Sequence, residues 1–156
     1  MATSSPARKV AVDSGVVIAR VTGDRPEHAD GIAALFHEID SGKVELYGST
    51  LLLVEVLDGG FKDPFDQTKE NQILAVLDNP NVIRLVQGSR QAAMTARALR
   101  REYNLKVADS MHLASAIFAG IDKFMTIDDG FPIGKTVRGV EVCYPDSAYG
   151  TPVLGS

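Results

Sequence analysis

Short apolar runs alternate with stretches of helical spacing along this chain of 156 residues. Runs rich in valine, isoleucine, leucine and phenylalanine predict buried strands, which lie at residues 9–13, 44–49, 81–87, 123–128 and 137–145. Most positions within the runs are apolar, instead of alternating with polar ones. This pattern is typical of parallel strands that are covered on both faces.

Between the runs, apolar residues recur at the intervals of an α-helix, at residues 25–43, 50–60, 64–79, 89–104 and 107–119. Ser49 or Thr50 is expected to cap the second of these helices, and Gly59 and Gly60 are expected to end it. Asp-Ser-Gly after the first strand predicts a turn there. Strands that alternate with helices predict an α/β fold, a three-layer α/β/α sandwich around a central, mostly parallel five-stranded sheet.

The length and composition fit one folded domain. We assign it to residues 8–145, with loose termini at residues 1–7 and 146–156. The 45% of hydrophobic residues suffices for a core, and the single cysteine, Cys143, excludes an internal disulfide and a cysteine-rich zinc site. No apolar run approaches the ~20 residues that cross a membrane, and no signal peptide is evident. We therefore expect a cytoplasmic protein that does not enter membranes.

Charge is distributed unevenly along the sequence. The net charge of -4 argues against a protein that coats nucleic acid in general. Residues 84–106 nevertheless contain six Lys/Arg side chains and one acid, Glu102. Such a basic face binds a phosphate backbone, or it is simply a solvated helix face, and both interpretations stay open here.

Four acidic residues stand out because of the apolar segments around them. Asp13 ends the first predicted strand, Asp128 ends the fourth, Asp109 begins the helix before that strand, and Glu55 lies within LLLVEVL. Each has an ordinary interpretation. The two strand-end aspartates are typical turn residues, Asp109 is typical of a helix cap or first turn, and Glu55 fits a solvent-facing helix position.

A shared divalent cation would explain the four acids together. Sites in open α/β sheets form at the carboxyl ends of the strands, where Asp13 and Asp128 are expected. Clustered carboxylates repel each other unless a cation neutralises them, and Mg²⁺ and Mn²⁺ prefer such oxygen ligands. A bound ion of this kind lowers the pKa of water and stabilises charge on a phosphate. The acids therefore indicate metal-dependent chemistry on a phosphate group.

At these residues the chain resembles the PIN-domain nucleases, a family that includes the VapC-type toxins of bacterial toxin–antitoxin pairs. Four segments are similar to the family's motifs in the same order, over about residues 9–131. Each carries one acid: VAVDSGVVI with Asp13, GSTLLLVEVL with Glu55, LKVADSMHLASAI with Asp109 and DKFMTIDDGF with Asp128. The resemblance implies a PIN-like fold and a Mg²⁺- or Mn²⁺-dependent endoribonuclease that hydrolyses RNA. It also implies the toxin of a toxin–antitoxin pair and a homodimer.

The same resemblance assigns roles around the four acids, which would be the catalytic metal ligands. Ser14 and Thr126 are expected to hydrogen-bond the carboxylates or their waters. Asp129 competes with Asp128 for the fourth position, and we favour Asp128 because it directly follows the strand, two residues after Thr126. His112, one helical turn after Asp109, is expected to pack at the edge of the core rather than to act in catalysis.

Other functions stay open beside this one. Arg97, Arg100 and Arg101 are candidates for contacts to RNA phosphates, or they are merely solvated. A non-catalytic regulatory or protein-binding module of PIN-like fold would use the acids only as caps and turns. Phosphoryl transfer through Asp13 as the nucleophile is a third hypothesis, but the loop has no second acid two residues later, where Gly15 stands.

Overall fold

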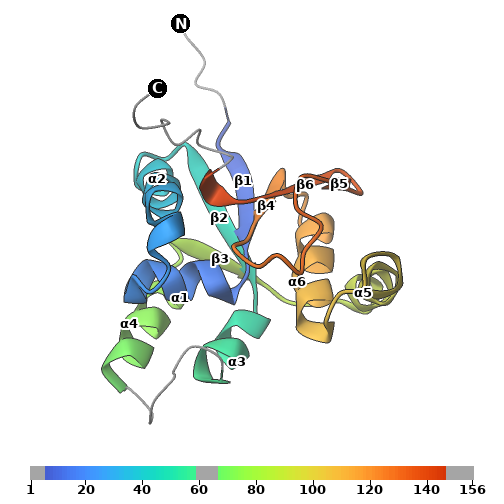
Figure 1. The fold of residues 1–156 in the computed structure, drawn as a ribbon, viewed down its shortest axis with the longest axis horizontal. Helices are drawn as coiled ribbons and strands as arrows, with labels where there is room; N and C mark the ends of the chain where they lie inside the picture. The colour runs from blue at the N-terminus through green and yellow to red at the C-terminus, as the bar shows by residue number, and fades with distance from the viewer. Residues whose placement is uncertain (1–5, 59–66, 147–156) are drawn as a thin grey trace, which may run out of the picture.

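The computed structural model describes residues 6–58 and 67–146, in which a six-stranded sheet lies between two layers of helices (Figure 1). The strand order is β3-β2-β1-β4-β6-β5, and all neighbours are parallel except the last pair. The strands are β1 (Arg8–Val12), β2 (Val44–Ser49), β3 (Ile83–Val86), β4 (Lys123–Met125), β5 (Thr136–Val137) and β6 (Val140–Cys143). The predicted α/β sandwich with a mostly parallel sheet is confirmed.

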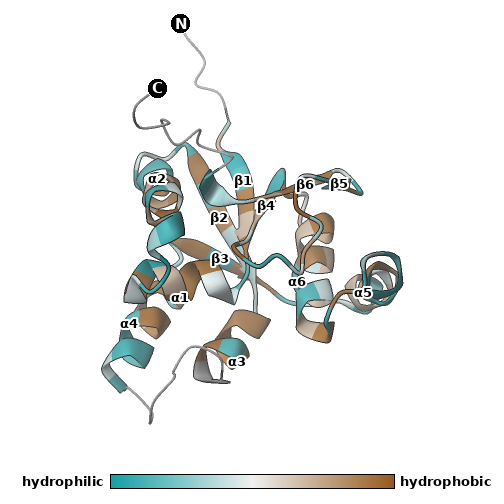
Figure 2. Cartoon of the chain, in the orientation of Figure 1, coloured by the Kyte–Doolittle hydropathy of each residue, from teal (hydrophilic) through white to brown (hydrophobic). Residues whose placement is uncertain are grey.

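Helices cover both faces of the sheet, and each layer has its own hydrophobic cluster. The first layer contains α1 (Ser14–Thr22), η1 (Pro26–His28), α2 (Ala29–Asp40), α3 (Leu51–Asp58) and α4 (Gln67–Leu77). The second contains α5 (Arg90–Tyr103) and α6 (Val107–Phe118), which pack against each other on the opposite side in Figure 1. In Figure 2 the strands between the layers are largely hydrophobic, as strands buried on both faces must be.

The order in which successive strands are added to the sheet reverses at β1, and this reversal creates the place for a site. β2 and β3 follow β1 on one side, whereas β4 pairs with β1 on the other side, with Val12 opposite Met125. The carboxyl ends of β1 and β4 therefore lie next to each other. A crevice at such a reversal is where ligands bind in open α/β sheets.

The sheet has six strands instead of the predicted five, because residues 137–145 do not form one strand. β5 and β6 are a hairpin, in which Val137 pairs with Val140. Arg138 (φ 48°) and Gly139 (φ 89°) form its two-residue connection, and both have positive φ angles. Positive φ at both positions matches the right-handed twist of the strands. The single glycine in VRGVEVC was too weak a signal to divide the apolar run.

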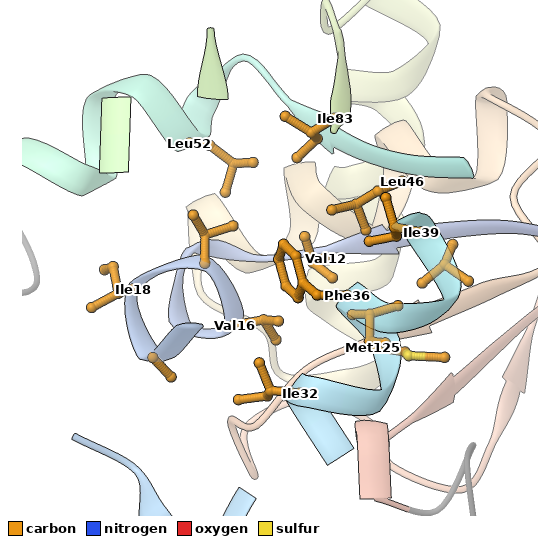
Figure 3. Close-up of a cluster of buried hydrophobic side chains, with 14 of the residues drawn as sticks. Val12, Val16, Ile18, Ile32, Phe36, Ile39, Leu46, Leu52, Ile83 and Met125 are labelled. Atoms are coloured by element: carbon orange, nitrogen blue, oxygen red, sulfur yellow. The ribbon is translucent and has the colours of Figure 1, made fainter. Parts of the chain in front are cut away.

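The turn predicted after the first strand is wrong, since residues 14–22 form helix α1. Val16, Val17 and Ile18 are β-branched and disfavour a helix intrinsically, but all three are buried in the core (Figure 3). Burial of this apolar face outweighs the local preference. Gly23 ends the helix in the left-handed conformation (φ 68°), which glycine adopts without strain.

The other elements agree with the sequence predictions apart from their ends. The Ser49 hydroxyl accepts a hydrogen bond from the Leu51 backbone N–H at 3.1 Å and so satisfies the first N–H of α3, whereas Thr50 directly precedes the helix and its carbonyl accepts from the Leu53 N–H. Gly59 and Gly60, residues 64–66 and most of the two termini lie outside the described residues. At the last described position, Asp146 accepts a hydrogen bond at 2.6 Å from the His28 ring. None of the helices in residues 6–58 and 67–146 has the length and hydropathy to cross a membrane.

Candidate functional site

Asp13 lies between β1 and α1, and its carboxylate is turned to the neighbouring strand instead of to the helix. It is the N-cap residue of α1 by position, but its side chain makes no capping hydrogen bond. Its Oδ2 accepts a hydrogen bond from the Thr126 hydroxyl at 2.7 Å. Asp13 is 5% exposed and Thr126 is fully buried just after β4. The interpretation of Asp13 as a simple turn or cap residue does not account for this arrangement.

The second oxygen of Asp13 lacks compensation in its buried position. Oδ1 is buried and has no hydrogen-bond partner among the described residues. The pKa of Asp13 is raised from 3.8 to about 6, chiefly by burial and further by repulsion from Asp109 and Asp128. The Thr126 hydrogen bond and a positive charge on the His112 ring act in the opposite direction. The protein thus holds a carboxylate where the negative charge is disfavoured.

Asp109 interacts electrostatically with each of the other three acids. It occupies the first turn of α6 and is partly buried. Burial raises its pKa, followed by repulsion from Asp128 and then from Glu55, and Asp109 in turn raises the pKa of Asp13. The amino end of a helix ordinarily stabilises a carboxylate. The net rise therefore means that burial and repulsion outweigh the favourable helix position.

Glu55 reaches the same region from α3. Gly48 at the end of β2 lets α3 approach, because a Cβ there would lie 2.4 Å from a methyl group of Leu52. The Glu55 side chain is 27% exposed, and its Oε1 accepts a hydrogen bond from Nε2 of His112. The helix therefore turns Glu55 toward α6.

The two aspartates after β4 have different partners. The Asp128 backbone N–H donates to the Thr126 hydroxyl at 3.0 Å, and the Asp128 carboxylate accepts from the Gly130 N–H at 2.9 Å. Asp128 thus forms the turn expected of it, yet its charge also acts on Asp13 and Asp109. Asp129 instead accepts a hydrogen bond from the Tyr144 hydroxyl. These contacts support Asp128 as the fourth acid of the site.

The chemistry of this site fits a hard divalent cation. Within the described residues, no three His, Cys, Asp or Glu side chains already surround one point closely enough to hold a metal ion. The donors are nevertheless carboxylate oxygens, one of them buried and without a partner. Raised pKa values at Asp13 and Asp109 show that the site favours added positive charge. A cation would supply that charge.

Comparison with known proteins identifies the family of this chain. The PIN domain family matches residues 10–133, most of the chain. The chain belongs to the PIN domain family. Among curated protein sequences, none matches it significantly.

Solved structures share the fold of this PIN domain. VapBC2 from Rickettsia felis, bound to a promoter DNA fragment, has a TM-score of 0.63 at 13% identity, over 86% of this chain and 96% of that chain. DNA-bound VapBC from Salmonella typhimurium has a TM-score of 0.59 at 19% identity, over 88% and 98%. VapC20 from Mycobacterium tuberculosis, a toxin that cleaves the sarcin-ricin loop, has a TM-score of 0.55 at 14% identity, over 78% and 92%. At these identities the likeness establishes the fold alone.

A basic groove lies beside the acids in this PIN domain. Arg97, Arg100 and Arg101 of α5 line a groove of ≈ 550 Å³, whose opposite wall includes Ser110 of α6, the residue after Asp109. Among the described residues, no acidic side chain lines this groove. The Arg100 Nε donates to the Leu105 carbonyl at 3.3 Å, so part of this guanidinium stabilises the connection to α6. Arg97 and Arg101 are exposed, and α5 is mostly hydrophilic in Figure 2.

Two of the predicted supporting residues differ in what they do. Thr126 bonds Asp13 and Asp128 as described above, whereas the Ser14 hydroxyl has no hydrogen bond to any of the four acids within the described residues. His112 packs in the core, 2% exposed, as expected from the sequence, but it also contacts Glu55. The spacing of three residues between Asp109 and His112 was the available signal, since it places both on one side of a helix.

Proposed function

We propose that this PIN domain is a Mg²⁺- or Mn²⁺-dependent endoribonuclease that acts as the toxin of a toxin–antitoxin pair. The observation that carries the proposal is the state of Asp13. Its carboxylate is buried, has an oxygen without a partner, and is repelled by two further aspartates. An arrangement with this cost to folding is expected where a cation is bound in function.

In this proposal the four acids, Thr126 and the arginines of α5 have separate roles. Asp13 and Asp109 bind the ion, with Glu55 and Asp128 as further ligands, directly or through water. Thr126 holds one oxygen of Asp13 by its hydroxyl, which leaves the other oxygen for the ion. When bound, a divalent ion supplies a lowered pKa of water and stabilisation of charge on the scissile phosphate. Arg97 and Arg101 bind neighbouring RNA phosphates in the basic groove and position the strand.

The alternative of a non-catalytic module uses the same acids only as caps and turns. Asp128 does form a turn, and this contact fits the alternative. Asp13, however, makes no capping bond and is buried with a raised pKa. A module that binds no metal has no use for a buried carboxylate with a raised pKa, so the geometry supports the nuclease better.

The proposed partners come from the structural neighbours. VapBC2 and the Salmonella VapBC were crystallised with DNA, VapBC-5 from Mycobacterium tuberculosis is a member of the VapBC family of toxin–antitoxin systems, and VapC20 is a toxin that cleaves the sarcin-ricin loop. By analogy with them we propose a cytoplasmic RNA substrate, an antitoxin encoded beside this chain, and a homodimer. Light scattering of the purified chain, alone and after co-expression with the adjacent reading frame, measures both assemblies.

Cleavage of a labelled RNA by the purified chain tests the proposal. We expect cleavage with Mn²⁺ or Mg²⁺ and none with EDTA. Asp109→Asn should lower the rate by roughly 10³-fold, because loss of the ion removes several kcal/mol of stabilisation from the transition state. The reaction is measured at the metal concentration that saturates the wild type, and circular dichroism verifies that the variant is folded.

An exposed aspartate provides the matched control. Asp40 lies at the end of α2 and is exposed, so Asp40→Asn should cleave RNA at the wild-type rate. Mn²⁺ should also raise the melting temperature of the wild type, because a ligand that binds only the folded state stabilises it. Full activity of Asp109→Asn would refute the assigned site, and cleavage that persists in EDTA would refute the metal dependence.

A further inference from the structure

His112 is a buried polar side chain with one hydrogen-bonding partner in the described part of the chain. It is 2% exposed on α6, and its Nε2 donates to Oε1 of Glu55. Its Nδ1 is buried and has no hydrogen-bond partner among the described residues. Buried polar groups are rarely left in this state. Within the described residues, the hydrogen bond to Glu55 is therefore the contact that explains a histidine at this position.

The two partners differ in how firmly the fold holds them. His112 is fixed by α6, where the adjacent Leu113 and Ala114 are fully buried. Glu55 projects from α3 with a side chain that is 27% exposed. A partly exposed glutamate keeps several rotamers, and restricting it costs side-chain entropy. A rigid ring that contacts a flexible carboxylate restricts the carboxylate, not the reverse.

The contact keeps Glu55 near the other acids. Glu55 repels Asp109 and contributes to the raised pKa of Asp109, so repulsion alone would drive the Glu55 side chain toward solvent. His112 lies three residues after Asp109 on the same helix and opposes this movement. Asp109 thus repels the Glu55 carboxylate while His112 holds it, and in the structure the hydrogen bond between His112 and Glu55 is formed.

We propose that His112 is a positioning residue, which holds the Glu55 carboxylate beside Asp109 so that a divalent cation finds it in place. The proposal rests on the proposed function, because Glu55 must be a ligand for its position to matter. His112 itself does not touch the ion in this account. Hydrogen-bonding partners of metal-binding side chains typically change metal affinity by about 10–100-fold when removed.

A purely structural histidine is the competing explanation, and a double-mutant cycle on metal affinity separates the two. The full chain is titrated with Mn²⁺ alone at one pH by calorimetry. We expect His112→Leu to raise the Kd for Mn²⁺ by about 10–100-fold, and Glu55→Gln to raise it as well. The double variant should bind no more weakly than Glu55→Gln, because His112 acts through Glu55 and the effects are not additive.

Conservative and control variants guard against a loss of folding. The side-chain amide of His112→Gln can still donate to Glu55, so its Kd should stay within about threefold of the wild type, whereas the shorter His112→Asn should resemble His112→Leu. Ser115 is also buried on α6, and its hydroxyl has no partner among the described residues. Ser115→Ala changes the same helix without touching Glu55 and should bind Mn²⁺ as the wild type does. Melting curves in EDTA verify folding, and the Gln–Asn pair replaces His112→Leu if that variant is unfolded.

The possible results distinguish a failure of the positioning role of His112 from a failure of the metal site. Wild-type affinity in folded His112→Leu or His112→Asn overturns the positioning role, as does a cycle in which the two effects multiply independently. If Glu55→Gln weakens Mn²⁺ binding and the His112 variants do not, the metal site stands and only the role of His112 falls. A wild-type chain that binds no Mn²⁺ overturns the proposed metal site and the positioning role together.

Discussion

The acid site and the arginine groove adjoin the same turn of α6 but are built in opposite ways. Asp13 is 5% exposed, held by the buried Thr126 hydroxyl, and has a raised pKa. Arg97 and Arg101 are exposed on the outer helix α5. A buried charge is costly to folding, whereas an exposed charge contributes little to stability. Under the proposed function, the cost is therefore concentrated where an ion would be held in place, and the surface proposed to bind phosphates stays free to adjust to a flexible strand.

The pH dependence of the free energy of unfolding tests the account of the buried acid site. Here we expect the largest effect. The pKa of Asp13 is raised to about 6 in the folded state, so the folded state binds more protons than the unfolded state between pH 4 and 6. The stabilisation is present below pH 4 and is lost as the pH rises through 6. In EDTA, Asp13→Asn should therefore be more stable than the wild type at pH 7.5, by about 1–3 kcal/mol.

Urea unfolding at pH 4 and pH 7.5 measures this difference. The two proteins should be about equally stable at pH 4, where a protonated Asp13 resembles asparagine and Thr126 can donate to either side chain. Asp40→Asn should change stability little at both pH values. A destabilised Asp13→Asn at pH 7.5 would mean that the Asp13 charge is compensated in the metal-free protein, which contradicts the electrostatic account of the site.

The two adjacent aspartates after β4 sharpen the comparison at the boundary of the site. Asp128 acts on Asp13 and Asp109, whereas Asp129 bonds the Tyr144 hydroxyl. Asp128→Asn should lower the rate of RNA cleavage by about 10–100-fold at fixed Mn²⁺, and Asp129→Asn by no more than about threefold. Asparagine keeps the turn oxygen for the Gly130 N–H, so the fold is preserved. A larger loss in Asp129→Asn would exchange the roles of the two residues.

The exposed side of the comparison predicts the smallest effects. Arg97→Ala and Arg101→Ala should each weaken RNA binding by roughly three- to tenfold, since an exposed charged contact contributes about 1 kcal/mol. The slope of log K against log salt should fall by about 0.7 for each arginine that contacts a phosphate of a single strand. The rate at saturating RNA should stay the same.

Fluorescence anisotropy with a labelled RNA in EDTA measures the binding without cleavage. Arg90 is the matched control, because it is exposed at the start of the same helix and does not line the groove. Arg90→Ala should leave both the affinity and the salt slope unchanged. Equal losses in all three variants would mean that the helix attracts RNA only by its overall charge.

The sequence predicts correctly those structural features that depend on residues close together along the chain. The apolar runs determined the strands β1 to β4, and helical spacing determined α2 to α6, because periodicity and burial follow from local residue order. The Asp128 backbone N–H donates to the Thr126 hydroxyl two residues earlier, a local bond within TID. Local order failed for α1, whose β-branched residues are helical only because the core covers them.

The sequence by itself determined which acids stand at the ends of which elements, and therefore that Asp13, Glu55, Asp109 and Asp128 were candidates for one site. Only the tertiary structure decided that Thr126 bonds Asp13 across 113 residues and that His112 bonds Glu55 across 57. Such contacts depend on the order of strands in the sheet and on which helices cover each face. That order follows from how the whole chain buries its apolar surface, and no short segment contains it.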